Sequence, residues 1–364
     1  MKIGLITYLN CHYECFAFLL ESLSYHDITI IVKENYDSFN YLHYYSSLYN
    51  FNVCYGEHNK TEIMEKYDKV FKITSQDGCV NNRDVISLLH LKHFTKSCKS
   101  KKLLSLTPYV NGPKISYTFP VYCPIIKNSI NNKTVTMVGY YSNDCIDDDT
   151  KNFINSNPEY IFNFVINNKE NCYDNLKNLK NVKLFHKVNA VELCEIVNQS
   201  KYILSRKFIN YDRFSGQLGL AISFEKPLLL DSKTKTDYNL PGIGFQKEYC
   251  EIGNLNNIAD EEYTCLLNGI KIFKVDALYA NKKILTKLIY GEDLLQNEWL
   301  AYKKHWTLLD NNTFISLVDT CLKKNTLNLS ELKNNFKMEI EKGKKVLFIR
   351  NFNNEYFVVL TLKK

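Results

Sequence analysis

Short apolar segments alternate with helical patterns along the first part of this 364-residue chain, and this alternation constrains its fold more than any other feature. Strand patterns rich in apolar and β-branched residues lie at residues 2–9, 27–33, 51–56, 68–74 and 101–107, and helical patterns at 11–23 and 83–98. Strands and helices in this order predict a parallel, doubly wound sheet. Because helices cover both faces of such a sheet, its strands can be apolar throughout.

A proline-dense connector then interrupts the pattern. Residues 108–128 hold four of the seven prolines, which predicts an irregular segment or an inter-domain linker. The alternation restarts after it, with strand patterns at 133–141, 159–167, 181–188, 201–206 and 226–231 and helical patterns at 147–158, 189–200 and 215–223. The sequence therefore predicts an α/β protein with two Rossmann-like domains.

The last part of the chain has a different character. Longer helical patterns occupy residues 260–270, 280–306 and 312–324, and residues 344–364 predict a β-hairpin around an Asn-rich turn. We expect an amino-terminal domain at 1–125, a second domain at 126–257, and a helical region at 258–364. This last region is predicted to pack back on the amino-terminal domain and to end in the hairpin.

Composition narrows the functional classes. A net charge of +7 is mild for this length and shows no concentrated basic face, so no nucleic-acid partner is expected. The 12 cysteines have no metal-ligand spacing and are expected to be reduced thiols. No signal peptide and no membrane span are predicted, which favours a cytoplasmic protein. Abundant Tyr and Asn suit an AT-rich genome, and a viral or protist source is our expectation.

Residues 201–231 predict a strand, a glycine-containing helix start and a second strand. Ser205, Arg206 and Lys207 would stand at the carboxyl end of the first strand, where ligands bind in open α/β sheets. The helix opening at Ser215–Gly216 presents free N–H groups that suit a phosphate, and Arg213 could add positive charge. An ordinary helix cap explains the same pattern, so the residues alone leave both interpretations open.

This unit resembles the late segment of GT-B glycosyltransferases, in which a strand leads to a Gly-rich helix start and then to "G-K-P". Here it reads SGQLGLAISFEKPLLL, and the preceding VKLFHKVNAVELCEIVNQSKYILS is also similar to the family. The resemblance covers about residues 133–232; the amino-terminal half matches only in its order of elements. It implies a nucleotide-sugar site that comprises Gly139, His186, Lys187, Val188, Ser205, Arg206, Lys207, Asp212, Arg213, Ser215, Gly216 and Gln217.

Two departures from the family pattern stand out. Retaining members place two acidic residues eight apart across this helix; Asp212 matches the first, but Leu220 occupies the second position. The usual basic pair after the early strand of the second half is also missing, because YYSNDC follows Gly139. These departures leave the subfamily and the stereochemical outcome open.

Glycosyl transfer by an inverting route needs a base near neutral pKa, and His12 directly follows the first strand with Glu14 beside it. We predict both as catalytic; the alternative is a loop histidine without a partner. Asp147–Asp149 could be a metal motif but is better explained as a helix cap, and His90 with His93 lacks further ligands. No cofactor or divalent metal is therefore expected.

The aromatic segment 39–49 could stack on sugar rings or simply pack in the core. Together these features predict a hexosyltransferase-type glycosyltransferase of glycan biosynthesis. It would move a sugar from a nucleoside diphosphate sugar to an acceptor hydroxyl of a glycan, protein or small molecule. A sugar-nucleotide epimerase on the same scaffold and a catalytically decayed GT-B-like binding protein are the alternatives.

Overall fold

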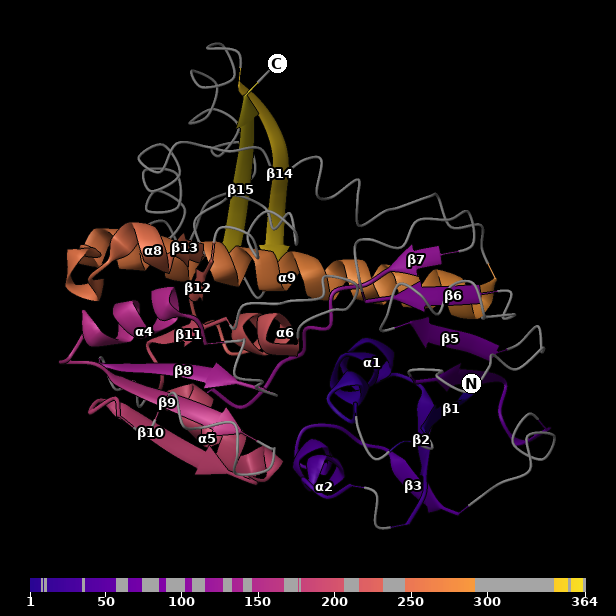
Figure 1. Ribbon diagram of the computed structural model, residues 1–364. Coiled ribbons are helices and arrows are strands. Elements are labelled where there is room, and N and C mark those ends of the chain that lie inside the picture. The colour runs from indigo at the N-terminus through magenta and orange to yellow at the C-terminus, as the bar shows by residue number, and fades with distance from the viewer. Residues whose placement is uncertain are drawn as a thin grey trace.

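The computed structural model describes residues 1–7, 9, 12–34, 37–56, 65–73, 85–89, 102–106, 115–126, 133–139, 146–166, 176, 178–205, 216–231, 246–291, 344–352 and 355–362. Two parallel sheets lie side by side, one long helix crosses both, and a hairpin ends the chain (Figure 1). This confirms the predicted α/β class with two Rossmann-like domains.

The first lobe is built on a seven-stranded parallel sheet in the order β3-β2-β1-β4-β5-β6-β7. Its strands are β1 (Lys2–Thr7), β2 (Asp27–Val32), β3 (Asn52–Tyr55), β4 (Lys69–Lys72), β5 (Val85–Leu89), β6 (Lys102–Ser105) and β7 (Ile115–Tyr117). Helices α1 (Cys15–Leu23) and α2 (Tyr41–Ser46) belong to the same lobe. Eight of the nine residues of α1 are buried, because the helix lies between the sheet and the neighbouring helix α9.

Two predictions in this lobe are wrong. The helix expected at 83–98 is strand β5 over Val85–Leu89, and all five of its residues are buried. A strand buried on both faces shows no alternation of polar and apolar residues, so its apolar run resembles a buried helix. Strand β7 lies inside segment 108–128, which was predicted as irregular or as an inter-domain linker; residues 118–126, after β7, do contain no helix or strand. Residues 90–101, which include His90 and His93, fall outside the described residues.

The second lobe carries a six-stranded parallel sheet in the order β10-β9-β8-β11-β12-β13. Its strands are β8 (Thr134–Val138), β9 (Ile161–Ile166), β10 (Val182–His186), β11 (Tyr202–Leu204), β12 (Leu228–Leu230) and β13 (Gln246–Glu248). Its helices are α4 (Asp148–Asn155), α5 (Ala190–Gln199), α6 (Gly216–Ser223) and α8 (Tyr249–Ile252). The Asp147 carboxylate accepts the Thr150 N–H at 3.0 Å, which confirms that this acidic segment caps a helix.

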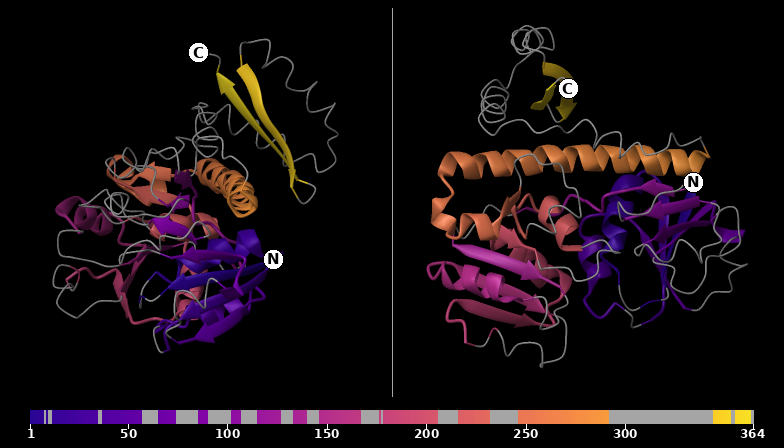
Figure 2. Two further views of the ribbon diagram at one scale, coloured as in Figure 1. Left: turned by 90° about the vertical axis from the view of Figure 1, so that its right-hand side faces the viewer. Right: turned by 45° about the horizontal axis from the view of Figure 1, so that its top comes forward.

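Helix α9 (Asp260–Tyr290) runs unbroken for 31 residues and packs on α1 of the first lobe and on α6 of the second (Figure 2). The prediction had divided this segment into two helices. None of the helices in the described part of the chain is long and apolar enough to span a membrane.

Strands β14 (Lys344–Phe352) and β15 (Glu355–Leu362) pair antiparallel, which confirms the predicted hairpin.

Candidate functional site

The two lobes present the carboxyl ends of their strands to each other. The arrowheads of β5, β6 and β7 point toward the second lobe, and those of β8, β9 and β10 point toward the first (Figure 1). The chain order reverses direction beside the first strand of each sheet, between β1 and β4 and between β8 and β11. Such switch points are where open α/β sheets bind ligands. His12 follows β1, and Gly139 and Ser205 follow β8 and β11, so these three predicted residues lie near the switch points, whereas His186–Val188 lie at the end of β10, two strands away from β8.

Gly139 ends β8 in a conformation that side chains rarely adopt, with φ of +133°. A Cβ atom here would lie 3.1 Å from Gln217 Nε2. The Gln217 side chain is buried and donates a hydrogen bond to the Val138 carbonyl. Residues at the end of β8 and at the start of α6 are therefore tied together, as a ligand site shared by the two would require.

The two glycines of α6 have different surroundings. A Cβ atom on Gly216 would meet no heavy atom within 4 Å among the described residues, whereas one on Gly219 would lie 2.5 Å from the Pro120 carbonyl oxygen. Gly219 therefore permits close packing on the inter-lobe connector, whereas we had expected it to let the helix pack tightly on its own sheet. Gly216 leaves open space at the exposed first residue of the helix.

The family resemblance implies that Phe185–Val188, the last two residues of β10 and the two that follow it, border the nucleotide base. His186 and Lys187 are exposed, and Lys187 has a positive φ of 50°. The Lys187 N–H donates to the Ile166 carbonyl at 3.3 Å, which holds the turn against β9. Val188 is half-buried against the core.

Ser205 is only 1% exposed, and its N–H donates to the Leu229 carbonyl at 2.9 Å. It lies at the predicted strand end but not on an open surface. Arg206, Lys207, Asp212, Arg213 and Ser215 lie outside the described residues. Leu220 packs against the apolar core, so the family's second acidic position holds a core side chain in this chain.

His12 and Glu14 form a contact at the start of α1. His12 Nδ1 lies 3.2 Å from Glu14 Oε1, and the two side chains are 23% and 42% exposed. His12 has φ of +68°, a conformation that costs a residue with a Cβ about 1–3 kcal/mol and is most frequent at functional sites. His12 therefore has a partner in Glu14, and the catalytic role of the two residues stays a prediction.

The tyrosines of segment 39–49 pack between the lobes. Tyr44 and Tyr45 are 7% and 1% exposed, and the Tyr45 ring lies 6.2 Å from that of Tyr122 in the connector. Burial raises the pKa of both phenols, so they stay neutral. Packing, rather than stacking on a sugar, accounts for these two residues.

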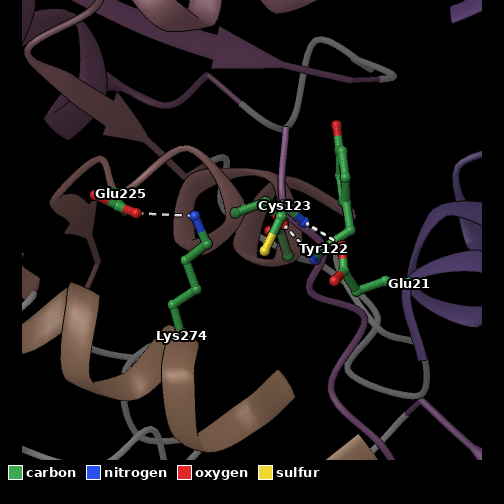
Figure 3. Close-up of polar contacts among 7 residues, drawn as sticks. Glu21, Tyr122, Cys123, Glu225 and Lys274 are labelled. Carbon is green, nitrogen blue, oxygen red and sulfur yellow. Dashed lines mark hydrogen bonds and ion pairs between the residues drawn. The ribbon is translucent and has the colours of Figure 1, made fainter. Parts of the chain in front are cut away.

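The connector itself is held from both lobes (Figure 3). The Glu21 carboxylate of α1 accepts the Cys123 N–H at 3.0 Å, and Ser223 Oγ of α6 accepts the Tyr122 N–H at 3.1 Å. Nearby, Lys274 of α9 pairs with Glu225 at 2.8 Å. Burial and Glu21 raise the pKa of Cys123 to about 11, so its thiol is protonated and is not a nucleophile at neutral pH. The sequence carried no signal for these contacts.

Lys226, the lysine of the "K-P" pair, is only 3% exposed. Its ammonium donates to the Asn198 carbonyl in the last turn of α5 at 2.7 Å, and burial lowers its pKa to about 8. Lys226 therefore caps the carboxyl end of α5 rather than facing a ligand.

Among the described residues, no three His, Cys, Asp or Glu side chains are grouped to hold a metal ion.

No family model and no curated protein matches this sequence. Solved structures do share its fold. HepE from Anabaena, in complex with UDP and glucose, is 11% identical over 79% of this chain and 99% of its own, with a TM-score of 0.52. AviGT4, a glycosyltransferase involved in avilamycin A biosynthesis, is 10% identical over 80% of this chain and 98% of its own, with a TM-score of 0.53. The chain has the GT-B fold.

Proposed function

We propose that this chain is a glycosyltransferase that moves a sugar from a nucleoside diphosphate sugar to an acceptor hydroxyl. The observation that carries the proposal is the pair of facing switch points. The switch point of the first lobe bears His12 in contact with Glu14. That of the second lobe bears Gly139 and, at the start of α6, Gly216. The shared fold of HepE, solved with UDP-glucose, and of the glycosyltransferase AviGT4 supports it.

In this proposal the second lobe binds the donor. The positive end of α6 at Gly216 faces the diphosphate, and Ser215, Arg206, Lys207 and Arg213 add hydrogen bonds and charge. His186, Lys187 and Val188 border the base. Gly139 lies beside the donor at the end of β8, which Gln217 holds in place, and the buried Ser205 supports the site from the end of β11. Asp212, which matches the family's first acidic position, is assigned to the same site. Positive charge from the protein offsets the departing diphosphate, so no divalent metal is required.

The first lobe binds the acceptor and supplies the base. A carboxylate only accepts hydrogen bonds, so the proton of the His12–Glu14 contact sits on Nδ1 and the lone pair is on Nε2. Nε2 takes the proton of the acceptor hydroxyl while that oxygen bonds to the anomeric carbon. The bond from that carbon to the phosphate oxygen breaks, and the nucleoside diphosphate leaves with its electron pair. A single displacement of this kind inverts the anomeric configuration.

Two assays test the proposal. Thermal shift against UDP, GDP and dTDP reports binding, and incubation with the matching sugar nucleotides reports chemistry. Transfer to an acceptor, or slow donor hydrolysis without one, supports a transferase. Conversion of the sugar nucleotide alone identifies an epimerase, and binding without turnover identifies a decayed scaffold. Failure of every nucleotide to bind contradicts the proposal.

A further inference from the structure

Helix α5 begins directly after the proposed nucleotide loop, and most of its first amides are satisfied within its own lobe. Asn189 Oδ1 accepts the Glu192 N–H at 3.0 Å, and Glu192 Oε2 accepts the Asn189 N–H at 2.9 Å. This capping box uses the amides of the cap residue and of the third helical residue. It leaves the amide of the first helical residue, Ala190, for another acceptor.

That acceptor comes from the opposite lobe. The Phe39 carbonyl accepts the Ala190 N–H at 2.7 Å. Apolar packing continues the contact, because the same core contains Leu42, Tyr44 and Tyr45 of α2 and Ala190, Leu193, Cys194 and Val197 of α5. The end of the nucleotide loop is therefore attached to the first lobe.

Asp37 holds the turn that presents this carbonyl. Its two carboxylate oxygens accept the N–H groups of Tyr41, at 3.0 Å, and Leu42, at 2.7 Å. In the turn between Asp37 and Tyr41, Asn40 adopts φ of +56°, which Asn tolerates better than most residues. A single carboxylate thus fixes the start of α2 and, with it, the direction of the Phe39 carbonyl.

We propose that Asp37 is a positioning residue of the donor site. It sets the turn whose Phe39 carbonyl holds Ala190, and so fixes the Phe185–Val188 loop across the lobe junction. This inference rests on the proposed function, because it assumes that the loop borders the nucleotide. It predicts that changes in the first lobe, away from the ligand, alter the affinity for the donor nucleotide.

Ala190→Pro removes the donor and forces the Phe39 carbonyl away, because the proline ring occupies the direction of the lost N–H. Proline is accepted at the first helical position, where its missing N–H is not used by the helix. The preceding Asn189 already has φ of −76° and ψ of 173°, the extended conformation that a following proline requires. Asp148→Pro is the matched control, since Asp148 is the first residue of α4, follows a cap with φ of −80° and ψ of 179°, and is 90% exposed.

The experiment titrates the full-length wild type, Ala190→Pro, Asp148→Pro, Asp37→Ala and Asp37→Asn with the nucleoside diphosphate that binds the wild type most tightly. We expect Ala190→Pro and Asp37→Ala to weaken its Kd roughly fivefold or more. We expect Asp37→Asn, which keeps one acceptor oxygen, to retain most of the affinity, and Asp148→Pro to match the wild type. The KM for the acceptor should stay unchanged in all variants.

A wild-type Kd in folded Ala190→Pro and Asp37→Ala overturns this inference alone. Equal weakening by Asp148→Pro also overturns it, because the effect would then be general destabilisation. If Ala190→Pro fails to fold, Asp37→Ala against Asp37→Asn decides the question. A wild type that binds no nucleotide overturns the proposed function, and this inference with it.

Discussion

Asn281 of α9 binds both backbone groups of Phe119 in the inter-lobe connector. Its Nδ2 donates to the Phe119 carbonyl at 2.6 Å, and its Oδ1 accepts the Phe119 N–H at 3.1 Å. Both residues are buried, and the Phe119 ring packs edge-on against Phe273 of the same helix at 5.2 Å. One amide side chain therefore binds both backbone polar groups of Phe119 and ties α9 to the connector.

Replacing Asn281 by Leu should destabilise the fold strongly. Both Phe119 backbone groups would lose their hydrogen bond to Asn281, while the carbonyl keeps the Val121 N–H at 2.8 Å, so we expect a cost of about 1–3 kcal/mol in total. Urea unfolding measures the loss, and Lys271→Ala, an exposed change on the same helix, is the control. A variant as stable as the wild type would show that the connector finds other partners.

His12→Ala should lower kcat by about 10²- to 10⁴-fold, the usual contribution of a positioned base, and leave nucleotide affinity nearly unchanged. Glu14→Gln should cause a smaller loss, because it weakens the orientation of the ring without removing Nε2. Steady-state kinetics with saturating donor measures both, and His43→Ala, an exposed histidine of the same lobe, is the control. A His12→Ala enzyme with wild-type kcat would remove this residue from the chemistry.

The two glycines of α6 give a matched pair. Gly216→Val adds a side chain in open space and should weaken nucleotide binding at little cost in stability, while Gly219→Val should destabilise the fold because Pro120 O occupies that space. Calorimetric titration and thermal unfolding separate the two effects. A Gly216→Val protein with full affinity and activity would show that this helix start is only a cap.

Arg206→Ala should weaken nucleoside diphosphate binding and leave the melting temperature of the free protein unchanged. The reason is the loss of a bidentate partner for the diphosphate. Titration with the diphosphate and with the free nucleoside tests this, since the nucleoside lacks the charge that Arg206 would contact. An equal effect on both ligands would argue against contact with phosphate.

Buried Lys226 predicts an unusual pH dependence. Its folded pKa of about 8 lies below its ordinary value, so above pH 8 the unfolded chain binds more protons than the folded one. The free energy of unfolding should therefore rise with pH above 8, by at most about 1.4 kcal/mol per pH unit, relative to Lys226→Met.

The comparison with Lys226→Met matters because Cys123 and Cys194 act in the opposite direction. Burial raises both of their pKa values to about 11, which lowers stability above pH 9 in both proteins alike. The difference in the free energy of unfolding between the wild type and Lys226→Met, measured from pH 7.5 to 9, therefore reports the titration of Lys226 alone. A difference between the two proteins that does not change with pH would mean that Lys226 titrates normally.

Local patterns predicted most of the fold. Runs of β-branched residues marked the central strands. Strand β5 was predicted as a helix because its five buried residues show no alternation of polar and apolar side chains. Strand β13 is too short and too polar to be recognised. The helical patterns at 260–270 and 280–306 were predicted as separate, whereas α9 continues through the residues between them. His12 and Glu14 are close in sequence and were predicted together. The contacts of Asn281 with Phe119 and of Phe39 with Ala190 join distant residues and left no local signal.

The most direct test is a crystal structure of the protein soaked with UDP-, GDP- and dTDP-sugars. We predict a diphosphate at the start of α6 beside Gly216, the base against His186–Val188, and the sugar directed toward His12. A nucleotide bound elsewhere, or no nucleotide at saturating concentration, would contradict the account.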